Sequence, residues 1–193
     1  MTHRRARSGR LPQLKNFTVS DPYSRGQKER ERGQQPSTEE FPLSLAEFVE
    51  MTHCLKCDDW QIDLCSRLES LMWRRGVRWL IHAPPQAGKS VILSQRFIPW
   101  LLGALPELRV KLACYNIAQA TRFSRICREL MESREYAALF PSGLCRLSRK
   151  ANTQEEWSTL ARKQTRDSQP SLKALGLATG FVGQGADLLI IDD

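Results

Sequence analysis

The segment from Val77 to Pro106 most constrains the fold, because its hydrophobic period changes across a short loop. Val77–Ala83 (VRWLIHA) is a short apolar run with β-branched and aromatic residues, which is typical of a buried strand. Helical spacing resumes in SVILSQRFIPWLLGALP, where Pro99 is expected to kink the helix or end its regular part. The stretch between them, PPQAGK, therefore joins a strand to the start of a helix.

The same alternation of strand and helix continues to the end of the sequence. LRVKLACYN predicts a second strand, a helix follows from about Ile117 to Met131, and ADLLIIDD predicts a last strand. Trp157 and SLKALGLA suggest a hairpin laid on the sheet. Two helices are expected before the loop, one capped by Ser44 with Glu47 and one ended by Gly76. This order predicts an α/β fold with a mostly parallel sheet flanked by helices.

Residues 1–40 differ in composition from the rest of the chain. They are rich in Arg, Gln, Gly, Pro and Ser, so burial of apolar surface cannot offset the entropy of ordering them. We expect a disordered basic arm here, either without a role or weakly attracted to DNA, followed by a helical lead-in at residues 41–76. The whole chain carries 29 Lys and Arg against 21 Asp and Glu, and its net charge of +8 favours a polyanionic partner such as nucleic acid.

The cysteines and the hydropathy pattern bear on the compartment. Six cysteines lack the dense, regular spacing of a secreted disulfide scaffold, so reduced thiols in a cytosol are expected. His53, Cys54, Cys57 and Cys65 are also possible zinc ligands, although core thiols on one helix face are the favoured interpretation. No apolar run is long enough to span a bilayer and no secretory signal begins the chain. We therefore expect a cytoplasmic protein without membrane contact.

The loop carries the residue types that bind a nucleoside triphosphate. Gly88 permits close approach of the backbone, Lys89 can reach the β and γ phosphates, and Ser90 can place its hydroxyl on Mg²⁺. The expected phosphate-binding residues are Pro85, Gln86, Ala87, Gly88, Lys89 and Ser90. The strict signature requires glycine where Ala83 stands, so a chance GKS in a strand-to-helix turn is the alternative.

The last strand supplies an acidic partner for this loop. DLLIIDD ends in two carboxylates, of which Asp192 would join Ser90 in the Mg²⁺ site and Asp193 would orient or deprotonate a water as the catalytic residue. The alternative for Asp193 is the first residue of the following loop. Lys89 and Asp192 are expected to face each other at the tips of neighbouring parallel strands. Together the two motifs predict a P-loop NTPase fold of the ASCE type that binds ATP and Mg²⁺.

The residues also resemble a known family, the ATPase domain of the large terminase subunit, which is the DNA-packaging motor of tailed bacteriophages and prophages. The matching stretches are RWLIHAPPQAGKSVILSQRFIPWLLGALPELRVKLACYNIAQATRFSRICREL, YAALFPSG and LATGFVGQGADLLIIDD. An APP opening before GKS is familiar in that family, and the resemblance covers about Trp60–Asp193. DDWQ resembles the segment in which such motors read adenine, so Gln61 would bind the base; an ordinary polar position on a helix is the alternative.

This resemblance implies a motor that hydrolyses ATP to drive double-stranded DNA into a procapsid. It also implies a small terminase subunit and a portal protein as partners, a homo-oligomer in the full-length form, and a place in the bacterial host cytoplasm. Two departures are present. Gln86 stands where members often carry an arginine, so a catalytic arginine would come from elsewhere, such as a neighbouring subunit.

The second departure is that the chain stops at Asp193, directly on the second motif. We therefore expect residues 77–193 to be a partial P-loop ATPase domain, truncated after the acidic (Walker B) strand, in an N-terminal fragment without the nuclease domain. Such a fragment is expected to bind nucleotide at most. The alternatives are a helicase-like P-loop ATPase and a catalytically silent prophage remnant.

Overall fold

A computed structural model describes residues 18–20, 42–54, 56–72, 74, 76–149, 153–165, 168–179 and 185–192. The predicted arm at residues 1–40 lies outside the described residues apart from 18–20, and so does Asp193. Within the ranges given, no helix has the length and apolar character that a membrane crossing requires.

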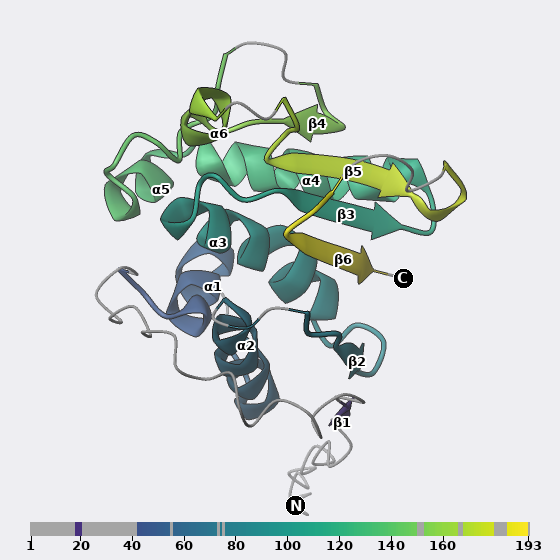
Figure 1. Ribbon diagram of the computed structural model, residues 1–193. Helices are drawn as coiled ribbons and strands as arrows, with labels where there is room; N and C mark the ends of the chain where they lie inside the picture. Colours follow the sequence, from purple (N-terminus) through teal and green to yellow (C-terminus); the bar gives the residue numbers. More distant parts are fainter. Residues whose placement is uncertain are drawn as a thin grey trace, which may run out of the picture.

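A four-stranded mixed sheet occupies the centre of the fold (Figure 1). Its order is β4 (Glu156–Trp157), β5 (Leu172–Gly176), β3 (Val110–Cys114) and β6 (Leu188–Asp192). β3 runs parallel to both β5 and β6, and Cys114 lies opposite Gly176 on one side and Asp192 on the other. The carboxyl ends of these three strands therefore meet at one edge. The expected α/β architecture is confirmed at this level.

Two helical segments cover one face of this sheet. α4 (Ile117–Met131) and the continuous helix formed by η3 (Val91–Phe97) and α3 (Ile98–Ala104) lie behind the strands in Figure 1. Leu112, Ala174 and Ile190 are buried side by side in neighbouring strands; all five residues of β3 are buried, whereas burial alternates along β5. On the opposite face of β6, Leu189 and Ile191 are 47% and 58% exposed, so this face is open among the described residues.

Two helices precede the β2–η3 loop, as predicted. α1 (Leu45–His53) begins with a capping box in which Ser44 Oγ accepts the Glu47 N–H and the Glu47 carboxylate accepts the Ser44 N–H. α2 (Asp59–Leu71) has a second capping box between Asp58 and Gln61. α2 ends at Leu71, before the predicted stop at Gly76.

β2 (Leu80–His82) differs from the strand predicted at Val77–Ala83. It is shorter, pairs antiparallel with β1 (Thr18–Ser20), and does not join the four-stranded sheet. Leu80 is 58% exposed, so the expectation of a buried strand is wrong. We also expected the β2–η3 loop and Asp192 to lie at the ends of neighbouring parallel strands. This expectation is wrong, because β2 does not belong to the sheet that contains β6. The contact between them is made by the helix that begins at the loop.

The remaining connections follow the predicted order with two differences. β4 and β5 pair antiparallel as the predicted hairpin, but β5 is a strand of the sheet and not a layer on it, and α6 (Leu160–Gln164) lies between the two. α5 (Arg134–Leu139) and the short turn η4 (Leu177–Thr179) complete the elements. Pro99 does not end its helix, because it lies in the first turn of α3 directly after the π-type turns of η3.

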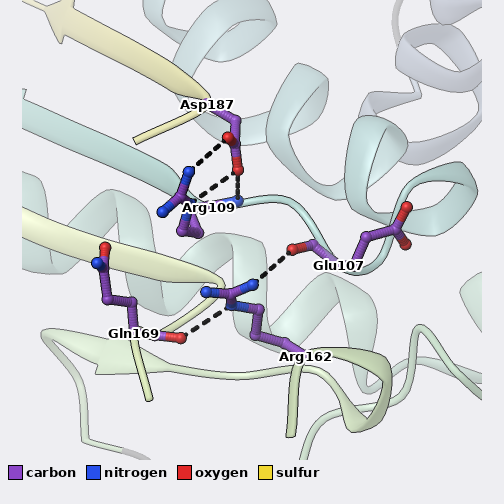
Figure 2. A network of polar contacts seen from close by, with 5 residues as sticks. All are labelled: Glu107, Arg109, Arg162, Gln169 and Asp187. Carbon is purple, nitrogen blue, oxygen red and sulfur yellow. Dashed lines mark hydrogen bonds and ion pairs between the residues drawn. The ribbon is translucent and has the colours of Figure 1, made fainter. Parts of the chain in front are cut away.

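A polar network ties the amino ends of the strands together, at the edge opposite Asp192 (Figure 2). Arg109 precedes β3 and donates from Nε and Nη2 to the two carboxylate oxygens of Asp187, at 3.0 and 2.8 Å. Arg162 donates to the backbone carbonyl groups of Gln169 and Glu107, at 3.0 and 3.3 Å. The network therefore fixes the starts of β3 and β6 and the connection into β5.

Asp187→Asn is expected to lower the free energy of unfolding at pH 7 by about 1 kcal/mol or less, since solvent screens this partly exposed pair. Hydrogen bonds from the Arg109 side chain hold the pKa of the Asp187 carboxyl below its ordinary value. Its stabilisation is thus present above the unfolded pKa, near 4, and is lost as the pH falls through the folded pKa. Urea unfolding of both proteins at pH 7, 4 and 3 should show a difference that shrinks with acidification; a constant difference would contradict this.

Candidate functional site

The carboxylate of Asp192 lies buried at the carboxyl end of β6, with only 2% of the residue exposed. Ser90 Oγ donates a hydrogen bond to its Oδ1 at 3.0 Å, and Ser94 Oγ donates one to its Oδ2 at 2.5 Å. Residues four apart share one face of a helix, so a single helical face presents both hydroxyls to the acid. The structure thus brings together Ser90 and Asp192, the two residues predicted to share a metal ion.

No cation among the described residues neutralises this carboxylate, and Lys89 has no carboxylate partner among them either. A buried charge without a counter-ion is costly, and the hydroxyls of Ser90 and Ser94 offset part of that cost. Burial, together with the Asp192 charge, also raises the pKa of the neighbouring Cys114 thiol to about 11. The position beside Asp192 therefore favours a cation.

The β2–η3 loop (Ala83–Gly88) contains two residues with positive φ angles. Gln86 and Gly88 have φ angles of +61° and +87°, whereas Ala87 between them does not have a positive φ. Among the described residues, none accepts a hydrogen bond from the backbone N–H groups of Gly88, Lys89 and Ser90. Successive N–H groups in such alternating conformations, at the start of a helix, form a concavity that favours an anion.

Gln61 lies against this loop from the first turn of α2. Its Nε2 donates a hydrogen bond to the Ala87 carbonyl at 3.0 Å, and its Oε1 accepts one from the Asp58 N–H at 2.9 Å. A Cβ atom added at Gly88 would lie 2.9 Å from the same Nε2. The amide expected to read adenine is therefore bonded to backbone groups at both ends.

The oxygen ligands at the loop suit Mg²⁺ only in combination with phosphate. Mg²⁺ is usually held by one or two protein oxygens together with waters and substrate phosphate oxygens, and Ser90 with Asp192 supplies that number. No group of three or more His, Cys, Asp and Glu that could hold a metal converges in the described part of the chain. For the zinc alternative, Cys65 is buried and the pKa of its thiol is raised to about 12, which disfavours the thiolate ligand.

The remaining predicted residues fall in three groups. Pro85 and Gln86 are exposed on the loop, while Ala87, Gly88 and Lys89 are half-buried beneath them. Asp193, the predicted catalytic residue, lies outside the described residues. Ser94 was not predicted, although the four-residue spacing in SVILS was the available signal.

No family model and no curated protein matches this chain.

Proposed function

We propose that this chain binds ATP with Mg²⁺ at the β2–η3 loop and belongs to the ATPase part of a large terminase subunit. The observation that carries the nucleotide site is the 3.0 Å hydrogen bond between Ser90 and Asp192, residues 102 positions apart. It sets a buried carboxylate without a described counter-ion beside a helix start whose N–H groups lack described acceptors. Phosphate and Mg²⁺ together would satisfy both.

Each residue then has a defined task. The N–H groups of Gly88 to Ser90 bind the phosphate oxygens, and the Lys89 ammonium neutralises the β and γ phosphates. Ser90 Oγ and the Asp192 carboxylate would hold the Mg²⁺ ion. Bound Mg²⁺ would neutralise charge on the phosphate oxygens. Ser94 fixes the orientation of the Asp192 carboxylate, and Asp193 stays the proposed catalytic acid that orients water.

The broader proposal follows the sequence resemblance and the charge of the chain. It comprises a P-loop NTPase fold of the ASCE type and DNA translocation driven by ATP hydrolysis. The partners are double-stranded DNA, a small terminase subunit, a portal protein and further copies of the chain, in the host cytoplasm. The net charge of +8 supports the DNA partner. The loop has Gln86 and no arginine, so a catalytic arginine would come from another part of the assembly.

Calorimetric titration of the chain with ATP, once with Mg²⁺ and once with EDTA, tests the nucleotide site. We expect one site per chain and an affinity that falls by at least tenfold when Mg²⁺ is removed. A chain that is folded by circular dichroism but gives no binding heat or thermal shift with Mg–ATP would refute the proposal.

A further inference from the structure

Gln61 connects two elements that are distant in sequence, the first turn of α2 and the β2–η3 loop. Its side chain spans from the Asp58 N–H to the Ala87 carbonyl, with both hydrogen bonds at 3.0 Å or less. These bonds use the amide oxygen and one of the two amide N–H groups. Each end of the amide therefore already has a backbone partner, and the two bonds together fix how the side chain lies against the loop.

The bond to Ala87 has a consequence for the next N–H group. The peptide bond is planar and trans, so the Ala87 carbonyl and the Gly88 N–H point in opposite directions. Because Gln61 holds the carbonyl toward α2, the Gly88 N–H points away from α2, and no described residue accepts its hydrogen bond. Gln61 therefore sets the direction of one of the N–H groups assigned to phosphate.

Gly88 lies close to the Gln61 amide and has no room for a side chain on that side. Its φ of +87° lies in the left-handed region, where a residue with a Cβ is strained. An added Cβ would also meet Gln61 Nε2 at 2.9 Å. The glycine therefore has a second role besides its conformation, because its lack of a side chain admits the Gln61 amide to the loop.

We propose that Gln61 is a positioning residue for the phosphate loop. This inference rests on the proposed triphosphate site. It states that Gln61 contributes equally to the binding of any ligand that carries a triphosphate, whether a purine nucleotide, a pyrimidine nucleotide or inorganic tripolyphosphate.

The test is a calorimetric series with ATP, GTP, CTP and inorganic tripolyphosphate, each with Mg²⁺. Gln61→Ala is expected to weaken all four ligands by the same factor, about three- to tenfold, at unchanged stoichiometry. Gln119→Ala is the matched control, because Gln119 occupies the same third position in the first turn of α4. It should bind all four ligands like the unmodified chain.

A second variant keeps the test informative if Gln61→Ala does not fold. In Gln61→Glu, the carboxylate can still accept the Asp58 N–H and cap α2, but it cannot donate to Ala87. We expect an unchanged unfolding temperature without ligand and a uniform loss of affinity. A loss confined to ATP, or no loss for any ligand, would overturn the inference. If the unmodified chain bound none of the four ligands, the proposed site itself would fail.

Discussion

Replacement of Lys89 by alanine is expected to weaken the binding of Mg–ATP by about 10- to 150-fold. The ammonium has no carboxylate partner among the described residues, so its charge is available to the phosphates. Loss of one or more charge-assisted hydrogen bonds, at roughly 1.5–3 kcal/mol each, gives this range. Calorimetry measures the affinity, and the unfolding temperature without ligand should stay the same because the side chain is not part of the core.

Lys163→Ala is the control for this prediction. Lys163 is an exposed lysine on α6, so its removal changes the net charge by the same amount without touching the loop. It should leave the affinity for Mg–ATP unchanged. If Lys89→Ala bound Mg–ATP as tightly as the unmodified chain, Lys89 would not be part of the site. If Lys89→Ala and Lys163→Ala lost the same affinity, Lys89 would act only through the net charge of the chain.

Mg²⁺ is expected to raise both the affinity for ATP and the thermal stability of the ATP-bound chain. Asp192→Asn is expected to remove both increases. Saturating ligand at about 100 times its dissociation constant stabilises a fold by about 2.7 kcal/mol, so the thermal shift is readily measured. The amide keeps the shape of the carboxylate and can still bond to the hydroxyls of Ser90 and Ser94. Without ligand, the variant should be at least as stable as the unmodified chain, because a buried charge without a described counter-ion is gone.

Asp192→Ala separates the charge from the hydrogen bonds. It leaves the buried Ser94 hydroxyl without its acceptor and should lower the free energy of unfolding by about 1–3 kcal/mol. A Mg²⁺-dependent thermal shift that persists in both Asp192 variants would contradict the assignment of Asp192 to the metal site.

Local signals explain why some elements were predictable from the sequence. α4 spans Ile117–Met131 as predicted, because Asn116 caps its first turn and apolar residues recur on one face. β3 and β6 were predictable because short apolar runs bounded by polar residues suit strands of a parallel sheet. The approach of Ser90 to Asp192 was predicted from neighbouring parallel strands, whereas the contact is made by the helix that begins at the loop, because β2 lies outside the sheet of β6.

The features that were missed depend on distant partners or on helix geometry. The isolation of β2 follows from its pairing with β1, a partner that hydrophobic pattern cannot identify. Gln61 was assigned to adenine from its sequence context, whereas its contact with Ala87 depends on how α2 packs against the loop. Ser94 was overlooked because only Ser90 was considered as a partner of Asp192, and the four-residue spacing between the two serines was not used.

The most direct test of the central claim is a change of metal preference at Ser90. Thiolate is a soft ligand that suits Cd²⁺ and not Mg²⁺, so Ser90→Cys should lose affinity for Mg–ATP and regain it when Cd²⁺ replaces Mg²⁺. The unmodified chain, which contains the same six native cysteines, controls for Cd²⁺ bound elsewhere. Our account predicts that only the variant binds ATP more tightly with Cd²⁺ than with Mg²⁺. Equal Mg–ATP affinity in the two proteins, with no preference for Cd²⁺ in the variant, would contradict a shared metal and triphosphate site at Ser90 and Asp192.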